Sequence, residues 1–268
     1  MQADPSRFAY FDAPAPLALA HRGGATYPPN RGIENSARAF RNAVELGYRY
    51  LETDVYASRD GEVFAFHDDT LRRVTGEPGA IRTMTAEAVR RARVGGIEPI
   101  PRLVDLLDEF TGARFNIDVK EDAAVAPALE AIVSSGATDR VCLASFSHER
   151  LRRIRALEPR VPTSFSPAEI RRLRLAPGRR LWSAGVRAGG VCVQVPHRYG
   201  RLTVVTGGFV RRCHTVGLPV HVWTVDDADE IRHLLDLGVD GIVSDRIDVL
   251  RDVLVERGQW VAPADGPG

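Results

Sequence analysis

The stretch "YRYLETDVYASRDGEVFAFHD", residues 48–68, decides how this chain is arranged. It contains two runs rich in aromatic and β-branched residues, and "YASRDGEV" joins them through an Asp60–Gly61 turn with no room for a helix. An Asp-Gly step between two such runs is typical of a β-hairpin. We therefore expect these two runs to be antiparallel neighbours.

Outward from the hairpin, short apolar runs alternate with amphipathic stretches. Seven further runs are typical of strands, at residues 17–22, 113–120, 140–146, 161–166, 190–196, 218–225 and 240–245. Helical patterns lie between most of them, and two of these patterns begin at a polar residue and end at a glycine, at residues 34–47 and 227–238. Repeated strand–helix units indicate a parallel sheet. Because the hairpin removes one run from the parallel set, eight remain, and they predict an α/β fold: a TIM-type (β/α)8 barrel with an additional hairpin strand near its mouth.

The length of 268 residues suits one such barrel. We expect a single domain over residues 1–268, with a core at about residues 17–258 and a flexible tail at 261–268. The longer connection at residues 69–100 is expected to form a short excursion over the barrel mouth, which is the end where the strands finish.

Composition limits the partners. A formal net charge of +1 gives no global field to attract nucleic acid or an acidic membrane. No run is long enough to span a membrane, and the first residues lack the pattern of a signal peptide, so we expect no stable membrane anchor. Three cysteines at scattered spacings form neither a disulfide framework nor a zinc pattern, which fits a reducing, cytoplasmic location. The oligomeric state stays open.

Acidic residues occur inside two of the apolar strands. Alternation places Glu52 and Asp54 on one face of their strand, and Asp118 and Lys120 on one face of theirs. Three carboxylates that converge in a barrel mouth repel each other unless a cation lies between them. Oxygen ligands favour Mg²⁺ or Ca²⁺ over zinc. The sequence therefore predicts one divalent cation, Mg²⁺ or Ca²⁺, at Glu52, Asp54 and Asp118.

Two histidines end predicted strands beside these carboxylates. His21 ends the first strand, and the hairpin is expected to bring His67 roughly opposite Glu52. Imidazoles titrate near neutral pH and suit general acid–base work. With the cations Arg22 and Lys120 nearby, such a site suits an anionic small-molecule substrate, most naturally a phosphate ester. His221, on a later strand, is interpreted as a packing residue.

Lys120 is the only lysine in a chain with 36 basic residues of the Lys and Arg types. An ammonium group is a compact point charge, whereas a guanidinium is a wide planar fork. A crowded interior position beside a metal would accept the first and reject the second. We therefore interpret Lys120 as a cation in a confined site.

Seven blocks, in order, resemble the signature blocks of the glycerophosphodiester phosphodiesterase family. They are "AHRGG", "ENS", "LETDV", "DGEVFAFHDDTLRRVTG", "NIDVK", "VHVWTVD" and "GVDGIVSDR", and the resemblance runs from about residue 17 to residue 258. It implies a TIM-type barrel and metal-assisted hydrolysis of glycerophosphodiesters to sn-glycerol 3-phosphate and an alcohol.

The resemblance also implies roles for single residues. His21 and His67 fall on the family's acid–base pair, and Arg22 and Lys120 on its phosphate-contacting cations. The metal ligands would be Glu52, Asp54 and Asp118, with Glu34 at the mouth and Trp223 lining the substrate pocket. Asp118 stands where the family more often carries Glu, and Ile33 replaces the usual proline before Glu34. The connection after His67 is short, which leaves the preferred alcohol open.

Three alternatives stay open from the sequence. One is a lysophospholipase D-type phosphodiesterase on the same barrel. Another, from a different class, is a Schiff-base aldolase that uses Lys120 as its nucleophile. The third is a barrel that binds phosphate esters without turnover.

Overall fold

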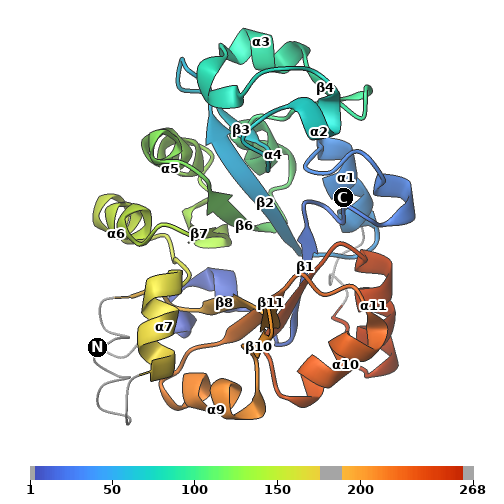
Figure 1. The fold of residues 1–268 in the computed structure, drawn as a ribbon, viewed down its shortest axis with the longest axis vertical. Coiled ribbons are helices and arrows are strands. Elements are labelled where there is room, and N and C mark those ends of the chain that lie inside the picture. The colour runs from blue at the N-terminus through green and yellow to red at the C-terminus, as the bar shows by residue number, and fades with distance from the viewer. Residues whose placement is uncertain (1–3, 176–188, 262–268) are drawn as a thin grey trace.

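A computed structural model describes residues 4–175 and 189–261 of the chain, and its centre is a curved parallel sheet (Figure 1). Seven strands follow one another in the order β7–β6–β2–β1–β12–β11–β8, and every neighbouring pair is parallel. Their bounds are β1 Leu17–His21, β2 Tyr50–Ala57, β6 Arg114–Val119, β7 Val141–Ala144, β8 Val193–Pro196, β11 Val220–Trp223 and β12 Gly241–Ser244.

A short extended segment joins the two ends of this sheet. Thr163 bridges to Leu143 of β7, and Ser164 bridges to Cys192 directly before β8, both in parallel. This segment lies inside the run predicted at 161–166. It takes the eighth position in the ring, so the predicted TIM-type (β/α)8 barrel is confirmed.

The predicted hairpin is also present. β3, Val63–Ala65, pairs with the second half of β2 in antiparallel fashion, with Val55 opposite Ala65. Gly61 has φ +91° in the turn, a conformation that glycine adopts without strain. Continuing this register places His67 opposite Thr53, one residue away from the expected position opposite Glu52, because the turn is centred on Asp60.

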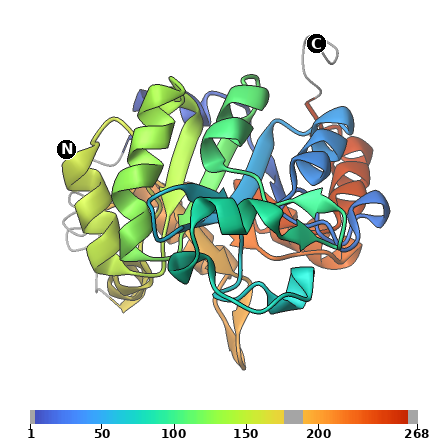
Figure 2. The same cartoon turned by 90° about the horizontal axis from the view of Figure 1, so that it is seen from above.

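Helices cover the outer face of the sheet (Figures 1 and 2). They are α1 Ala37–Glu45, α4 Leu103–Glu109, α5 Val125–Ser134, α6 His148–Leu157, α7 Pro167–Leu175, α9 Gly207–Thr215, α10 Ala228–Asp236 and α11 Ile247–Glu256. The two helices predicted from their end signals, α1 and α10, are capped by Ser36 and Asp227, whose side chains accept hydrogen bonds from backbone N–H groups of the first turn. None of the helices within the described residues is long and apolar enough to cross a membrane.

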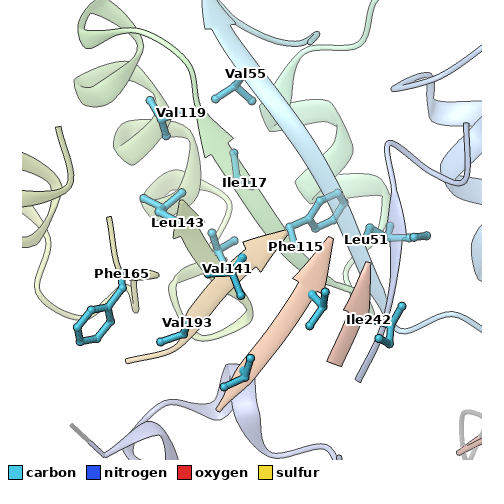
Figure 3. Packing of buried hydrophobic residues seen from close by; sticks show 14 of the residues in the cluster. Leu51, Val55, Phe115, Ile117, Val119, Val141, Leu143, Phe165, Val193 and Ile242 are labelled. Carbon is cyan, nitrogen blue, oxygen red and sulfur yellow. The ribbon is translucent and has the colours of Figure 1, made fainter. Parts of the chain in front are cut away.

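Alternation along the strands separates the core from the site. On β6, Phe115, Ile117 and Val119 are fully buried in the main apolar cluster under the helices (Figure 3). Asn116 and Asp118 lie between them in the sequence and point to the other face, into the barrel. Each fully buried aliphatic side chain contributes about 1.5–3 kcal/mol to stability, so the outward residues hold the strand while the inward ones carry polar groups.

The connection at 69–100 contains small elements of its own. They are α2 Arg72–Thr75, α3 Ala86–Arg91, β4 Arg93–Val94 and β5 Glu98–Pro99. Leu71, Ile81 and Val89 form a separate apolar cluster with Phe64 and Phe66 from the hairpin. That this excursion covers the mouth and that the chain is a single domain stay predictions. The tail predicted to be flexible lies, from residue 262 on, outside the described residues.

The N-terminal segment before β1 packs against the floor of the barrel, opposite the mouth. It forms two turns of 3₁₀ helix, Pro5–Arg7 and Ala9–Phe11. Tyr10 is fully buried and packs against Tyr50 and Cys142, and Tyr50 Oη donates a hydrogen bond to the Tyr10 carbonyl at 2.6 Å. The three cysteines are buried thiols.

Candidate active site

The loop after β1 turns sharply inside the mouth. His21 ends the strand, and the next three residues have positive φ: Arg22 at 50°, Gly23 at 82° and Gly24 at 90°. A Cβ on Gly23 would lie 2.9 Å from the Ala39 backbone, and one on Gly24 would lie 2.7 Å from Ile247. Only glycine fits these two positions. They hold the backbone of Arg22, a non-glycine residue in a left-handed conformation, over the end of the barrel.

Two strands bring the acidic residues together. In the register of β2 and β6, Glu52 lies beside Asn116 and Asp54 beside Asp118, while His21 of β1 lies beside Glu52. Glu52, Asp54 and Asp118 are all buried, at 6%, 2% and 6% exposure. The three predicted metal ligands therefore occupy one volume inside the mouth.

Lys120 follows β6 and reaches back over these carboxylates. Its Nζ lies 2.6 Å from Asp54 Oδ1 and 2.7 Å from Asp118 Oδ2. The side chain is 16% exposed. Burial alone would lower the pKa of Lys120, but the carboxylates of Asp118 and Asp54 raise it above its ordinary value, so the amine stays protonated. The single lysine of the chain is thus a confined ammonium between two buried carboxylates.

Arg22 connects the loop to three acidic residues. Its backbone N–H donates to Glu52 Oε2 at 3.2 Å, and its Nη1 donates to Glu34 Oε1 at 3.1 Å. Its Nε lies 3.3 Å from Asp54 Oδ2. Arg22 and Lys120 therefore approach Asp54 from different elements and form the cationic part of the site.

The two histidines are oriented in the same way. Nδ1 of His21 lies 2.7 Å from Asp245 Oδ1, and Nδ1 of His67 lies 2.6 Å from Asp68 Oδ1. A carboxylate at Nδ1 fixes the ring and holds a proton there, which leaves Nε2 for chemistry. Nε2 of His21 lies 3.7 Å from Glu52 Oε2, so it faces the carboxylates.

The excursion supplies Arg73, which ties two of these groups together. Its Nη1 and Nη2 donate to Glu34 at 2.8 and 2.6 Å, and its Nε and Nη2 donate to Asp68 at 2.5 and 3.0 Å. Burial would raise the pKa of Glu34, but Arg73 and Arg22 lower it on balance, so Glu34 is ionised at the mouth.

An aromatic pair flanks the cations. Trp223, at the end of β11, meets Phe146 edge-to-face with ring centroids 5.8 Å apart. Phe146 follows β7, is 64% exposed, and has Lys120 Nζ 5.9 Å from its ring centroid. An exposed aromatic side chain at that position offers an apolar surface directly beside the cationic part of the site.

Sequence reasoning missed three residues here. Asp245 could have been found, because it follows the strand that closes the ring next to β1, and the strand end beside His21 is where a partner must lie. Phe146 likewise follows a strand end. Arg73 carried no such signal, because the fold of residues 69–100 has no regular pattern from which its position could be read.

The inner carboxylates differ in charge state because their neighbours differ. Burial, and then the Asp54 carboxylate, raises the pKa of Glu52 to about 7. Burial also raises the pKa of Asp118, although Lys120 opposes this. For Asp54 the cations Lys120 and Arg22 outweigh burial and lower the pKa. For His21 burial lowers the pKa, but Glu52 and Asp245 raise it on balance.

These donors can be tested against a divalent cation. Within the described residues no three His, Cys, Asp or Glu side chains form a ready-made metal cluster. The Lys120 ammonium lies between Asp54 and Asp118. Asp118 Oδ1, however, is buried without a hydrogen-bond partner. Three cations, Arg22, Arg73 and Lys120, contact five carboxylates: Glu34, Glu52, Asp54, Asp68 and Asp118. A sixth carboxylate, Asp245, contacts His21. The unpaired oxygen and the excess of hard donors fit Mg²⁺ or Ca²⁺.

Comparisons with known proteins agree on one family. Residues 21–249 match the sequence model of the glycerophosphoryl diester phosphodiesterase family. A Mycobacterium tuberculosis protein named "Probable glycerophosphodiester phosphodiesterase 2" is 42% identical over 247 residues, which are 91% of this chain and 92% of that protein.

Solved structures share the fold. A putative glycerophosphoryl diester phosphodiesterase from Silicibacter pomeroyi superposes with a TM-score of 0.78 at 23% identity, covering 94% of this chain and 98% of that one. An Oleispira antarctica phosphodiesterase in complex with the product sn-glycerol-3-phosphate superposes with a TM-score of 0.76 at 21% identity, covering 90% and 97%.

A parallel barrel that gathers imidazoles, carboxylates and cations at its strand ends has the architecture of an α/β-barrel enzyme. The match over residues 21–249 and the 42% identity show more: the chain belongs to the glycerophosphoryl diester phosphodiesterase family and is an enzyme of that family.

Proposed function

We propose that this enzyme hydrolyses glycerophosphodiesters to sn-glycerol 3-phosphate and an alcohol. The observation that supports the proposal is the pair of imidazoles, each with Nδ1 on a carboxylate, together with the buried carboxylates and cations at the same strand ends. The relative from M. tuberculosis carries this activity in its name, and the Oleispira protein was solved with the same product.

The cations bind the phosphate. Arg22 and Lys120 offer a guanidinium and an ammonium from two different elements, so they contact different oxygens of one phosphodiester. Charge that develops on these oxygens during displacement is offset in a site that is largely shielded from water. Phe146 and Trp223 border the same volume and contact the alcohol or glycerol portion.

The histidines move the protons. One accepts the proton of the nucleophile, which is water or the glycerol 2-hydroxyl, and the other donates a proton to the departing alcohol. Asp245 and Asp68 keep both rings in the tautomer that presents Nε2. Their positions on separate strands, β1 and the hairpin, suit an in-line displacement with one imidazole on each side of phosphorus.

We propose that Glu52, Asp54 and Asp118 hold one divalent cation, Mg²⁺ or Ca²⁺. Such an ion, when bound, adds positive charge next to the phosphate oxygens. It would also offset the effects of burial and of the Asp54 carboxylate, which raise the pKa of Glu52. Asp118 is shorter than the Glu that the family more often carries, so its unpaired oxygen can contact the ion directly or through water.

The alternative of a Schiff-base aldolase is disfavoured by Lys120. A nucleophilic amine needs a lowered pKa, and the pKa of Lys120 is raised instead, because two carboxylates hold its proton.

The proposal also includes a cytoplasmic location, a single domain over residues 1–268 and the absence of a nucleic-acid partner.

Product analysis tests it. Purified enzyme is incubated with glycerophosphocholine, glycerophosphoethanolamine and lysophosphatidylcholine, with Mg²⁺, with Ca²⁺ and with EDTA. We expect sn-glycerol 3-phosphate and the free alcohol from the first two, and no turnover in EDTA. Release of phosphocholine and glycerol, or full activity after chelation and metal-free dialysis, would contradict the proposal. Faster turnover of lysophosphatidylcholine than of glycerophosphocholine would move the assignment to the lysophospholipase D type.

A further inference from the structure

A small hairpin stands out from the mouth. It follows β8 directly and consists of β9, Arg198–Tyr199, and β10, Leu202–Thr203, which are antiparallel. Figure 2 shows it, in orange, projecting beyond the rest of the barrel on the side where the excursion also lies. Gly200 in its turn has φ +58°, and a Cβ placed there would meet no atom within 4 Å. The glycine of the turn therefore faces open space.

The base of the hairpin is held in place. The His197 carbonyl accepts a hydrogen bond from the Val204 N–H at 2.9 Å, and Arg174 Nη1 donates to the Val204 carbonyl at 2.8 Å. The His197 ring is bonded through Nδ1 to Glu230 of α10. Since side chains from α7 and α10 fix both ends, the tip projects in a defined direction.

The tip carries an unusual combination of side chains. Tyr199 is 77% exposed and Leu202 is 52% exposed, and because they are directly paired across the two strands, both point to the same face of the hairpin. Arg198 and Arg201 are exposed as well, and no acidic side chain in the described part of the chain pairs with either. The hairpin has no acidic residue of its own.

This chemistry matches a lipid–water interface. Tyrosine places its ring at the level of head groups, leucine enters the acyl boundary, and arginine binds anionic head groups. A protein partner would need about 800 Å² of matched surface, far more than two side chains on a two-residue turn provide. A lipid surface requires no matching shape. The net charge of +1 gives no general attraction to anionic lipid, so the two guanidiniums must act locally.

We propose that the hairpin at residues 198–203 docks the mouth of the barrel on an anionic lipid surface. Tyr199 and Leu202 enter the interface, and Arg198 and Arg201 contact the head groups. Docking is reversible and places the opening, with the exposed ring of Phe146, toward the lipid. The proposal goes beyond the hydrolysis of soluble diesters and does not depend on it, because binding can be measured without turnover.

Vesicle flotation tests the docking. Wild-type protein is mixed at low ionic strength with vesicles of phosphatidylcholine alone or of an equimolar mixture with phosphatidylglycerol. We expect binding to the anionic vesicles only. The partition coefficient of Y199S/L202S should be about tenfold lower, since each substitution removes apolar surface that would leave water on binding. R198Q/R201Q should bind more weakly by about fivefold for each guanidinium removed.

A matched control uses apolar residues at the other end of the barrel. Leu157 and Val255 are 55% and 52% exposed and lie at the C-terminal ends of α6 and α11, which run back from the mouth to the floor. L157S/V255S should bind vesicles like wild type. Turnover of glycerophosphocholine in free solution should be equal in all these proteins, which separates loss of docking from loss of the active site.

Three results would overturn the proposal. They are no binding of wild-type protein to anionic vesicles, equal binding by Y199S/L202S and wild type, and equal loss of binding in L157S/V255S. Binding to heparin that matches vesicle binding and survives in Y199S/L202S would assign the hairpin to soluble polyanions instead.

Discussion

At the scale of the residue, Lys120 illustrates how a cation is chosen by space as well as by charge. Its Nζ has carboxylate oxygens at 2.6 and 2.7 Å, and only 16% of the Lys120 side chain is exposed. A guanidinium in the same place would need room for a planar group with three nitrogens. The sequence alone suggested confinement, and the two ion pairs supply the physical reason.

We predict that Lys120→Arg lowers kcat for glycerophosphocholine by about tenfold to a hundredfold, because the wide fork displaces Asp54 or Asp118. Steady-state kinetics measures this. Arg114→Lys, the reverse exchange at the opposite end of β6, is the control and should retain wild-type kcat. Normal activity of Lys120→Arg would mean that charge alone matters at this position.

Asp245 is the second informative residue, because it acts through His21. We predict that Asp245→Asn lowers kcat by about 10² to 10⁴ with little change in KM, since an amide can no longer stabilise the charged ring or fix its tautomer. Asp245 is one of the groups that raise the pKa of His21. Removing its charge should therefore move the limb of the pH–kcat profile that His21 controls to lower pH.

The control for this variant is Asp248→Asn, which removes a nearby carboxylate that pairs only with Arg246 at the surface in the described structure. It should keep the wild-type pH profile. An unchanged profile in Asp245→Asn would show that the 2.7 Å contact does not orient the catalytic ring.

At the scale of the element, the sequence was most informative where periodicity is strong. The apolar runs predicted the parallel strands and the Asp60–Gly61 turn predicted the antiparallel pair, because alternation and turn chemistry are local properties. The segment at 161–166 forms only isolated bridges, yet its position in the ring follows from the strand count. The excursion at 69–100 was predicted as a connection, but its internal fold was not, because Arg73 reaches Glu34 and Asp68 through short turns that have no sequence period.

That excursion makes its own prediction. Arg73 of the excursion donates hydrogen bonds to both Glu34 and Asp68. Arg73→Gln should therefore release both carboxylates and lower kcat/KM by about tenfold to a hundredfold. Arg72→Gln, an exposed neighbour in the same helix with no ion pair in the described structure, is the matched control. Equal kinetics for the two variants would contradict a role for the excursion in positioning His67.

At the scale of the whole molecule, the barrel interior beneath the site is polar but neutral. Gln194 Nε2 donates to Asn116 Oδ1 at 2.8 Å and lies 3.4 Å from His221 Nδ1. Burial lowers the pKa of His221 from 6.5 to about 4. Between pH 6.5 and about 4, His221 is therefore protonated in the unfolded chain and neutral in the folded barrel.

The contribution of neutral His221 to the free energy of unfolding should accordingly be fully present above pH 6.5. It should decrease by about 3 kcal/mol as the pH falls to 4. Urea unfolding at several pH values measures it. His221→Gln removes the titrating ring, so the stability difference between wild type and variant should shrink on acidification. A difference that stays constant from pH 7.5 to 4.5 would mean that burial does not lower the pKa of His221, because the ring then binds its proton equally well in the folded and unfolded states.

The packing of the N-terminal segment on the barrel floor has a practical consequence for truncated forms of the protein. The family match begins at residue 21, yet Tyr10 is fully buried beneath β1 and bonded to Tyr50. A protein shortened to the matched residues would lose most of β1 and the N-terminal segment with Tyr10. The ring of Tyr50 and the thiols of Cys142 and Cys192 would then be exposed to water and oxidants. The family match marks where relatives agree in sequence, whereas the packed core of this enzyme also includes Tyr10, which lies before the match.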